Sequence, residues 1–286
     1  QYVILSNELN NKLKINFENL TLLKIFKNKK KCLDMLRKFK LVKRKSFIIK
    51  NKHQLSQIIK FPCIIKPNIG TGSMHVSKIE NKKSLTSKVN YLLKNKVKVL
   101  FEEFVHGKEY SLEVFFLKGK IIFDQLIEKR INDNDHFVES AHLIRPRFNK
   151  KIIFAKKKIL NEIENFKLNK MFLHIEFKLT DNNDIEIIEI NPRLAGGFIP
   201  ILIKEATKLD LINSYLNLIL NNSKKEMKIY KFSEIYKIIF LIPAISTRVK
   251  SIKIKNNLNK SILKKMLYRD KIKKFENFNY DFSDRL

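Results

Sequence analysis

The fold is decided by residues 174–193, which read HIEFKLTDNNDIEIIEINPR. Two runs rich in Ile, Phe and Leu flank Asn182-Asn183, and asparagine tolerates the positive φ that a tight two-residue turn requires. The pattern therefore predicts a β-hairpin whose loop is centred between residues 182 and 183. Because side chains alternate between the faces of a strand, this centre also sets which residues face each other.

In the predicted register Glu176 lies opposite Glu189, and His174 lies opposite Asn191 on the same face. Carboxylates with Cβ atoms about 4.5–5.5 Å apart repel each other, so we expect a cation between them. Two carboxylates and an amide oxygen suit Mg²⁺, which takes its remaining ligands from water and substrate phosphates. Arg193 can reach the same phosphates with its bidentate guanidinium. The hairpin thus predicts the metal floor of a phosphoryl-transfer site, and the alternative is a surface hairpin with two exposed glutamates.

The composition is that of a globular protein with an excess of lysine. The chain has 286 residues, 44% of them hydrophobic, which is enough for one large or two smaller domains. A net charge of +31 is typical of proteins that bind nucleic acid or anionic membranes. The lysines are spread along the whole chain, so we do not expect nucleic acid as a partner, although a nucleotide would benefit from the positive field.

The cysteines and the apolar runs indicate a cytoplasmic setting. Cys32 and Cys63 provide neither a disulfide framework nor metal-ligand spacing, which predicts reduced thiols. The longest apolar runs, such as residues 238–242, are far shorter than the roughly 18 residues that span a bilayer, and we see no signal peptide. The chain begins at Gln1 within a strand-like run, residues 2–5, so we expect a fragment or a processed region.

The chain has only six glycines, whereas an average domain of this length would carry about 20. Each is therefore expected where no other residue fits. Gly119 predicts a hairpin turn, and the others fall in the segments described next. The six are Gly70, Gly72, Gly107, Gly119, Gly196 and Gly197.

The first third of the chain predicts a helix followed by a glycine flap. Asn28 can cap a helix with Lys29 in its first turn, where an ordinary solvated lysine is the alternative. Residues 61–67, ending in Lys66-Pro67, read as a short buried strand, and a loop with Gly70, Gly72 and Ser73 leads to a second strand at 76–79. A strand rather than a helix follows the glycines, so this is not a Walker loop. It predicts a mobile hairpin that closes over phosphates, with a plain tight turn as the alternative.

Two later segments carry further candidate site residues. Asn81 caps a predicted helix, and residues 97–105 read as a strand that leads into the sequence EEFVHGKEYSLE, residues 102–113. Its acids and backbone groups suit a nucleoside, and solvent-facing acids on an edge strand are equally favoured. Residues 137–146 read as a polar loop in which Glu139, His142 and Arg145 can bind a substrate carboxylate and amine, or are scattered loop charges.

The rest of the chain supplies structure rather than chemistry. An amphipathic helix is predicted over residues 152–166, and a well-buried helix over 199–221. Strands and a basic helix around residues 262–267 are expected after residue 223.

In this order the motifs resemble the ATP-grasp superfamily over residues 28–250. The nearest likeness is to carboxylate–amine ligases of the L-amino-acid ligase type, with biotin carboxylase and carbamoyl-phosphate synthase more distant. The resemblance implies an α+β fold in which two subdomains clasp ATP. Residues 1–27 would be a remnant or linker to a missing N-terminal domain, 28–104 the first subdomain with the lid, and 105–222 the second with the metal and acceptor site. Residues 223–286 would form a small C-terminal subdomain that stops early.

The resemblance also implies a role for each candidate residue. Contacts to ATP, the implied cofactor, are assigned to Lys29, Lys66, Gly70, Gly72, Ser73, Glu102, Glu103, Val105 and Glu109. One or two Mg²⁺ or Mn²⁺ ions are assigned to Glu176, Glu189 and Asn191. Arg193 and His142 are the catalytic candidates, and Glu139, Arg145, Gly196 and Gly197 are assigned to the acceptor pocket. His75 departs from the family, whose lids often have glycine there.

The implied reaction joins a carboxylate, in the first instance that of an amino acid, to an amine through an acyl phosphate, with release of ADP. The partners are then small molecules, and a homodimer is compatible with the resemblance. The alternatives are a biotin-carboxylase-like or carbamoyl-phosphate-synthase-like enzyme, a nucleotide-binding module without catalysis, and a basic nucleic-acid-binding protein.

Overall fold

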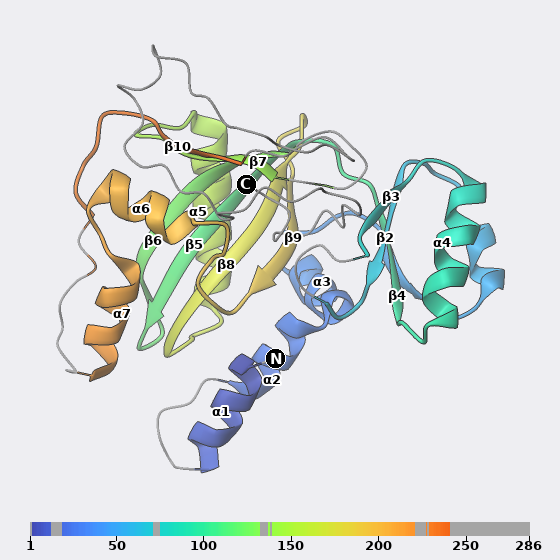
Figure 1. Cartoon of the computed structure of the whole chain (residues 1–286), viewed down its shortest axis with the longest axis horizontal. Coiled ribbons are helices and arrows are strands. Elements are labelled where there is room, and N and C mark those ends of the chain that lie inside the picture. Colours follow the sequence, from blue (N-terminus) through green and yellow to red (C-terminus); the bar gives the residue numbers. More distant parts are fainter. Residues whose placement is uncertain are drawn as a thin grey trace, which may run out of the picture.

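The computed structural model describes residues 2–12, 19–70, 75–131, 137, 139–220, 227 and 229–240. These residues form two antiparallel sheets that lie side by side, with helices packed on both (Figure 1). The smaller sheet has four strands in the order β1-β4-β2-β3, and the larger has six in the order β10-β7-β6-β5-β8-β9. The predicted α+β class is therefore confirmed.

The smaller sheet packs on helix α4. Asn81 caps this helix, as predicted, by accepting a hydrogen bond from the backbone N–H of Ser84. Leu85, Val89 and Leu92 of the helix are buried against the sheet. The elements of this part are β1 (Ser46–Ile49), the 3-10 helix η1 (Lys52–Gln57), β2 (Cys63–Pro67), β3 (Ser77–Ile79), α4 (Lys82–Lys94) and β4 (Val99–Glu103).

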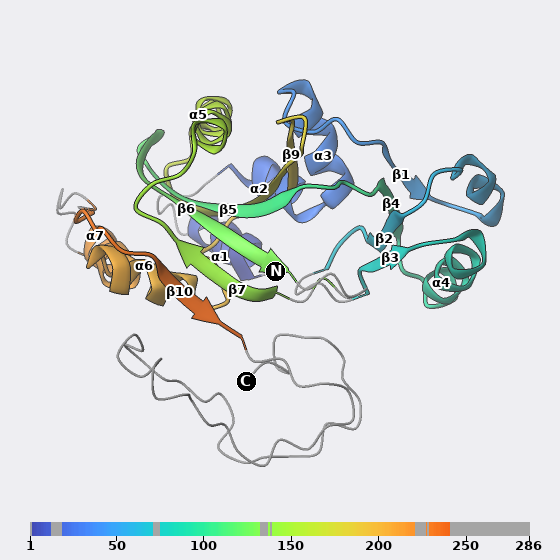
Figure 2. The same ribbon diagram turned by 90° about the horizontal axis from the view of Figure 1, so that it is seen from above.

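The larger sheet is buried on both faces (Figure 2). Helix α5 covers one face, and helices α6 and α7 cover the other. The elements of this part are β5 (Lys108–Leu117), β6 (Lys120–Ile131), β7 (Glu139–Ile144), α5 (Lys150–Glu164), β8 (Lys170–Leu179), β9 (Ile185–Asn191), α6 (Ile199–Thr207), α7 (Leu211–Leu220) and β10 (Tyr236–Ile239). Gly119 lies in the β5–β6 turn at φ +80°, as predicted.

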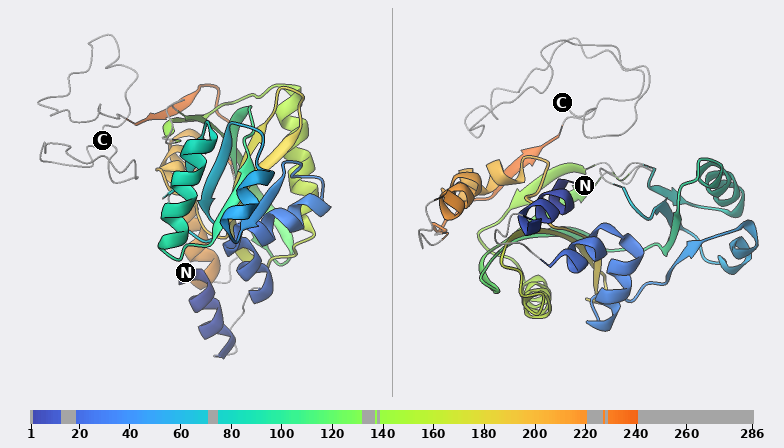
Figure 3. Two further views of the ribbon diagram at one scale, coloured as in Figure 1. Left: turned by 90° about the vertical axis from the view of Figure 1, so that its right-hand side faces the viewer. Right: turned by 90° about the horizontal axis from the view of Figure 1, so that it is seen from below.

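The N-terminal segment is helical, so the strand expected at residues 2–5 is wrong. It forms α1 (Tyr2–Lys12), which projects from the sheets beside α2 (Leu20–Lys27) (Figure 3). A four-residue apolar run cannot by itself distinguish a strand from a helix. The predicted helix after Asn28 is α3 (Lys29–Lys38), and Asn28 caps it through the N–H of Lys31.

Helices α2 and α3 pack with the larger sheet. Leu23, Phe26 and Leu33 belong to the same core as β5, β8 and β9. The division of the chain at residues 27/28 and 104/105 stays a prediction, and this packing adds that residues 20–38 contribute to the core of the second part.

Two expectations about secondary structure are corrected. The predicted loop at 137–146 contains strand β7, which pairs with β6 and β10, because residues 141–144 are buried and apolar apart from His142. The single helix expected over 199–221 is broken into α6 and α7. Lys208 ends α6 with φ 60°, and Asp210 accepts a hydrogen bond from Asn213 N in the first turn of α7.

The C-terminal region contributes one described strand. β10 lies at the edge of the larger sheet, and the basic helix expected at 262–267 falls outside the described residues. Within the part of the chain that the structure describes, no helix has the length and apolar character needed to cross a membrane.

Candidate active site

The hairpin of β8 and β9 has the predicted pairing at its functional end. His174 pairs with Asn191, and Glu176 pairs with Glu189. The turn, however, is longer than predicted, because β8 ends at Leu179 and β9 begins at Ile185. A β-bulge after Glu176 inserts Ile188 and corrects the register by one residue.

A cavity of about 350 Å³ lies between the two sheets and contains most of the predicted site. Residues from both sheets and from α3 line it. The predicted residues in its wall are Lys29, Lys66, Gly70, Glu102, Glu103, Val105, Glu109, Glu139, His142, Glu176, Glu189, Asn191, Arg193, Gly196 and Gly197. Gly72 and Ser73 lie outside the described residues.

Arg145 is the predicted substrate residue that does not line the cavity. Its Nε donates to Glu128 Oε2 at 2.6 Å. Arg145 follows directly after β7, and its side chain is held by this partner on the neighbouring strand β6. The assignment of Arg145 to the acceptor pocket is therefore not supported by its position.

The Lys29 side chain connects α3 to β9 and to Gly70, the first glycine of the loop that contains Gly70, Gly72 and Ser73. This loop is called the glycine loop below. Its Nζ donates to Glu189 Oε1 at 2.8 Å and to the Gly70 carbonyl at 2.9 Å. The N–H groups of Lys29 and Lys30 donate to the backbone and side-chain oxygens of Asn68. The first turn of α3 thus fixes the base of the loop and supplies one of the cations that the opposed carboxylates require.

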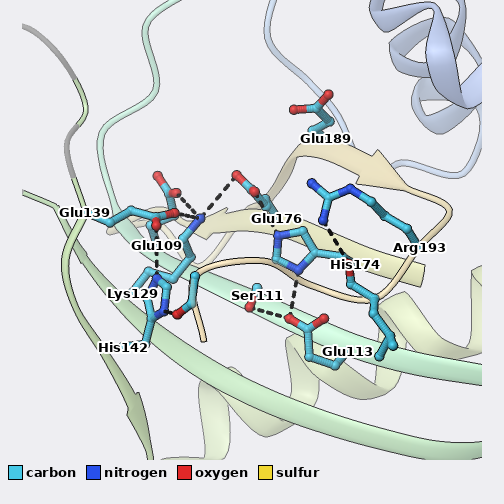
Figure 4. Close-up of polar contacts among 12 residues, drawn as sticks. Glu109, Ser111, Glu113, Lys129, Glu139, His142, His174, Glu176, Glu189 and Arg193 are labelled. Atoms are coloured by element: carbon cyan, nitrogen blue, oxygen red, sulfur yellow. Dashed lines mark hydrogen bonds and ion pairs between the residues drawn. The ribbon is translucent and has the colours of Figure 1, made fainter. Parts of the chain in front are cut away.

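Lys129 is the second cation, and it was not predicted from the sequence. Its buried Nζ lies 2.6 Å from Glu139, 3.2 Å from Glu176 and 3.3 Å from Glu109 (Figure 4). Burial disfavours the ammonium, but the three carboxylates offset that cost and raise the pKa of Lys129 well above its usual value. At Glu109 burial outweighs the attraction of Lys129, and the carboxyl pKa is raised.

His174 was predicted only as a neighbour of Asn191, and it orients Glu176. Its Nε2 lies 2.9 Å from Glu176 Oε1, and its Nδ1 lies 2.8 Å from Glu113, which also accepts from the Ser111 hydroxyl (Figure 4). Burial would lower the pKa of His174, but Glu113 and Glu176 raise it to about 10. Burial likewise opposes the charge on Glu176, yet Lys129 and His174 hold its pKa far below the usual range.

Glu139, His142 and Gly197 form a compact group in the wall of the cavity. The His142 ring nitrogens lie 3.1 Å from Glu139 Oε2 and 3.1 Å from the Gly197 carbonyl. Gly197 has φ +61°, and a Cβ there would lie 2.7 Å from His142 Cε1. His142 and Gly197 are thus in direct contact, as an acceptor pocket built from both would require.

The Glu102 carboxylate is engaged by two buried cations. Lys66 Nζ lies 2.6 Å from its Oε1, and Arg44 Nε lies 2.7 Å from its Oε2. Burial would raise the pKa of Glu102, but Arg44 and Lys66 lower it to about 2. Glu103 accepts a hydrogen bond from the N–H of Lys45. Glu102 and Glu103 therefore border the cavity, with their carboxylates held by the protein.

The sequence model of the ATP-grasp domain matches residues 59–201, which is half of the chain. The chain belongs to the ATP-grasp family. This ATP-grasp chain is 27% identical over 197 residues to a D-alanine–D-alanine ligase from Azobacteroides pseudotrichonymphae, covering 63% of this chain and 60% of that protein. It is 29% identical over 184 residues to an uncharacterized protein from Sinorhizobium fredii, covering 59% of this chain and 37% of that protein.

The ATP-grasp fold also relates this chain to solved structures. An L-amino acid ligase from Bacillus licheniformis superimposes with a TM-score of 0.70 at 16% identity, covering 86% of this chain and 61% of that one. This likeness concerns the fold. The chain spans about 60% of the length of that ligase and of the D-alanine–D-alanine ligase.

The donor set of this ATP-grasp site fits a hard divalent cation. Glu176, Glu189 and Asn191 present carboxylate and amide oxygens from one face of a hairpin. Within the described ranges no group of three or more His, Cys, Asp or Glu side chains is placed to hold a metal ion. Carboxylate and amide oxygens are the ligands that Mg²⁺ prefers, and it takes one or two carboxylates from a protein and the rest of its ligands from water and phosphates.

Proposed function

We propose that this protein is an ATP- and Mg²⁺-dependent ligase that joins a carboxylate, in the first instance that of an amino acid, to an amine. The proposal depends mainly on one observation, the cavity that residues of both sheets line together. It gathers Lys29, Lys66 and the hairpin residues Glu176, Glu189 and Arg193 from three distant segments of the chain. Two lysines, two carboxylates and an arginine at one cavity are the groups that phosphoryl transfer requires.

The nucleotide is assigned to the part of the cavity between β2, β4 and β8. Ile64, Val76 and Ile188 supply its apolar wall, and residues 103–105 border it. We assign Lys29, Lys66 and the glycine loop to the phosphates, Glu109 to the ribose, and Val105 with its neighbours to the adenine. The loop from Gly70 to Ser73 would cover the phosphates and exclude water.

We assign the metal and acceptor roles to residues on and next to the strands of the larger sheet. Glu176, Glu189 and Asn191 would hold Mg²⁺ or Mn²⁺, which neutralises phosphate charge when bound. Arg193 would stabilise charge on the transferred phosphoryl group and on the tetrahedral oxyanion. His142, Glu139, Gly196 and Gly197 would shape the acceptor pocket. Lys129 would hold the three acids around it in place.

The proposed reaction has two steps. The γ-phosphoryl group of ATP is transferred to the substrate carboxylate, which gives ADP and an acyl phosphate. The amine then attacks the acyl carbon, phosphate leaves, and an amide forms with loss of one proton from the nitrogen. A closed lid protects the acyl phosphate from hydrolysis. We propose that the reaction takes place in the cytoplasm. A homodimer is compatible with this proposal.

The test is an ADP-release screen over pairs of amino acids and other small carboxylates and amines, with Mg²⁺ and with EDTA. We expect ADP release that depends on Mg²⁺ and needs both the carboxylate and the amine substrate. Mass spectrometry should detect the amide product. ADP release with bicarbonate alone would instead favour a biotin-carboxylase-like activity. Protection from thermal unfolding by ATP without any ADP release would identify a binding module.

A further inference from the structure

Arg44 is a buried arginine that touches both sheets without lining the cavity. It lies in the segment between α3 and β1, and its side chain is only 2% exposed. Its Nε donates to Glu102 on β4, while its Nη1 donates at 2.9 Å to Glu186 on β9 and at 2.9 Å to the Ile187 carbonyl. One planar guanidinium therefore connects two strands that belong to different sheets.

The first connection reaches the lysine assigned to the phosphates. Glu102 is shared between Arg44 Nε, at 2.7 Å, and Lys66 Nζ, at 2.6 Å. Side-chain exposures of 2%, 3% and 6% for these three residues leave little room for other rotamers. The position of the Lys66 ammonium is thus set by a carboxylate whose other oxygen is held by Arg44.

The second connection reaches the bulge that sets the metal face. Glu186 also accepts hydrogen bonds from the backbone N–H groups of Lys43 and Arg44, and Ile187 N donates to the Leu41 carbonyl. Residues 41–44 therefore hold β9 directly before Ile188, the inserted residue that brings Glu189 opposite Glu176. Arg44 is the member of this segment that holds the Ile187 carbonyl with its side chain.

Stability alone is a poor reason for this arrangement. A buried ion network of this kind is usually no more stabilising than apolar side chains of the same size. Its value lies in geometry, because a guanidinium fixes two oxygen partners at defined angles, which a lysine ammonium does not. The charges of this network also balance. It contains two positive groups, Arg44 and Lys66, and two negative groups, Glu102 and Glu186.

We propose that Arg44 is a positioning residue that fixes the Lys66 ammonium relative to the metal-facing carboxylate Glu189. The inference rests on the proposed nucleotide site. Arg44 acts through two separate connections, one by Glu102 to Lys66 and one by Glu186 and Ile187 to the bulge before Glu189. The first should control nucleotide affinity in the absence of metal, and the second the gain in affinity that Mg²⁺ provides.

The experiment measures ADP affinity by calorimetry, in EDTA and in Mg²⁺, for wild type, Arg44→Lys, Lys66→Gln and the double variant. Arg44→Lys keeps the charge but loses the forked geometry. We expect it to weaken ADP binding in EDTA by about tenfold, and to reduce the Mg²⁺-dependent gain by a further several-fold. In the Lys66→Gln background the EDTA effect of Arg44→Lys should vanish, because the group through which it acts is gone.

Two further variants separate positioning from general destabilisation. Glu186→Gln weakens only the second connection, so it should reduce the Mg²⁺ gain and leave ADP affinity in EDTA unchanged, even if Arg44→Lys fails to fold. Asp184→Asn is the matched control, because it removes the exposed Lys43–Asp184 ion pair between the same two segments. It should change neither quantity.

The outcomes distinguish this inference from the proposed function. If wild type binds no ADP with or without Mg²⁺, the proposed function fails, and the inference fails with it. If wild type binds ADP but Arg44→Lys matches it, or lowers affinity equally in the wild-type and the Lys66→Gln backgrounds, only the positioning role is overturned. If Mg²⁺ increases the ADP affinity of Glu186→Gln as much as that of wild type, the role of the second connection is overturned.

Discussion

Glu176 lies directly opposite Glu189 on β8 and β9, yet each carboxylate is held by a different cation. Glu189 is bound by Lys29, and Glu176 by Lys129 and His174. The repulsion of an opposed acid pair is thus relieved by residues from α3, β6 and β8. Both carboxylates therefore have cationic partners on the face where the proposed function needs oxygen ligands.

Glu189→Gln should lower Mg²⁺-dependent ADP release by about 10²–10³ in kcat, the usual cost of losing one charge-stabilising group. The amide keeps the shape of the side chain but removes its charge, and it also weakens the ion pair with Lys29. Steady-state kinetics with the best acceptor pair measures the loss. Glu164→Gln, on the exposed end of α5, is the control, and equal rates for both variants would contradict the role of Glu189.

Glu102 should make stability depend on acid pH. Its carboxyl pKa is about 2 in the folded protein, against an ordinary value of 4.5, because Arg44 and Lys66 outweigh the effect of burial. A lowered folded-state pKa stabilises the protein above the unfolded value, and the contribution is lost as pH falls from about 4.5 toward 2. The difference corresponds to about 3 kcal/mol at neutral pH, of which about 2 kcal/mol is lost by pH 3.

Urea unfolding of wild type and Glu102→Gln between pH 7 and pH 3 measures this contribution. The variant should be less stable at pH 7, because Arg44 and Lys66 lose the charge that balances them. The gap in the free energy of unfolding should narrow as pH falls. If the difference in the free energy of unfolding between wild type and Glu102→Gln stays constant over this range, the pKa of Glu102 is not lowered in the folded protein.

The hairpin shows how far the sequence could predict the site. Two deviations cancel: the turn is centred on residue 182 rather than between 182 and 183, and the bulge at Ile188 shifts the pairing back by one. The predicted partners of Glu176 and His174 are therefore confirmed, although the predicted turn is wrong. A bulge leaves no clear mark in an isoleucine-rich strand, because every register there buries apolar side chains.

Lys129 was missed for the same physical reason. A plain hairpin around Lys118-Gly119 would place Glu128 opposite Glu109, but the bulge between Phe115 and Phe116 places Lys129 there. Counting from Gly119 could have located the cation to within one residue. Arg44 left no such signal, since its partners come from strands far away in the sequence.

Both cysteines should be unreactive in the native protein. Cys32 and Cys63 are buried free thiols, and burial raises the pKa of each to about 12. Since the thiolate is the reactive form, a disulfide reagent at pH 8 should label neither residue in buffer, but both in urea. Spectrophotometric thiol counting measures this. Rapid labelling of one thiol in buffer would show that its core opens readily.

Gly197→Ala should destabilise the protein at the contact between Gly197 and His142. The added Cβ would sit 2.7 Å from His142 Cε1, and the residue has φ +61°, which costs an L-residue about 1–2 kcal/mol by itself. His142 cannot move aside freely, because it is buried and contacts Glu139 and the Gly197 carbonyl. The free energy of unfolding from urea titration should fall by more than the backbone cost alone.

Two companion variants separate the contact from the backbone strain. At Gly196 an added Cβ meets no atom within 4 Å, so Gly196→Ala should change the free energy of unfolding by less than about 0.5 kcal/mol. In a His142→Ala background the close contact is absent, and Gly197→Ala should then cost only the strain of its positive φ. If the cost of Gly197→Ala is the same with and without His142, the two residues are not in the contact that an acceptor pocket between β7 and α6 requires.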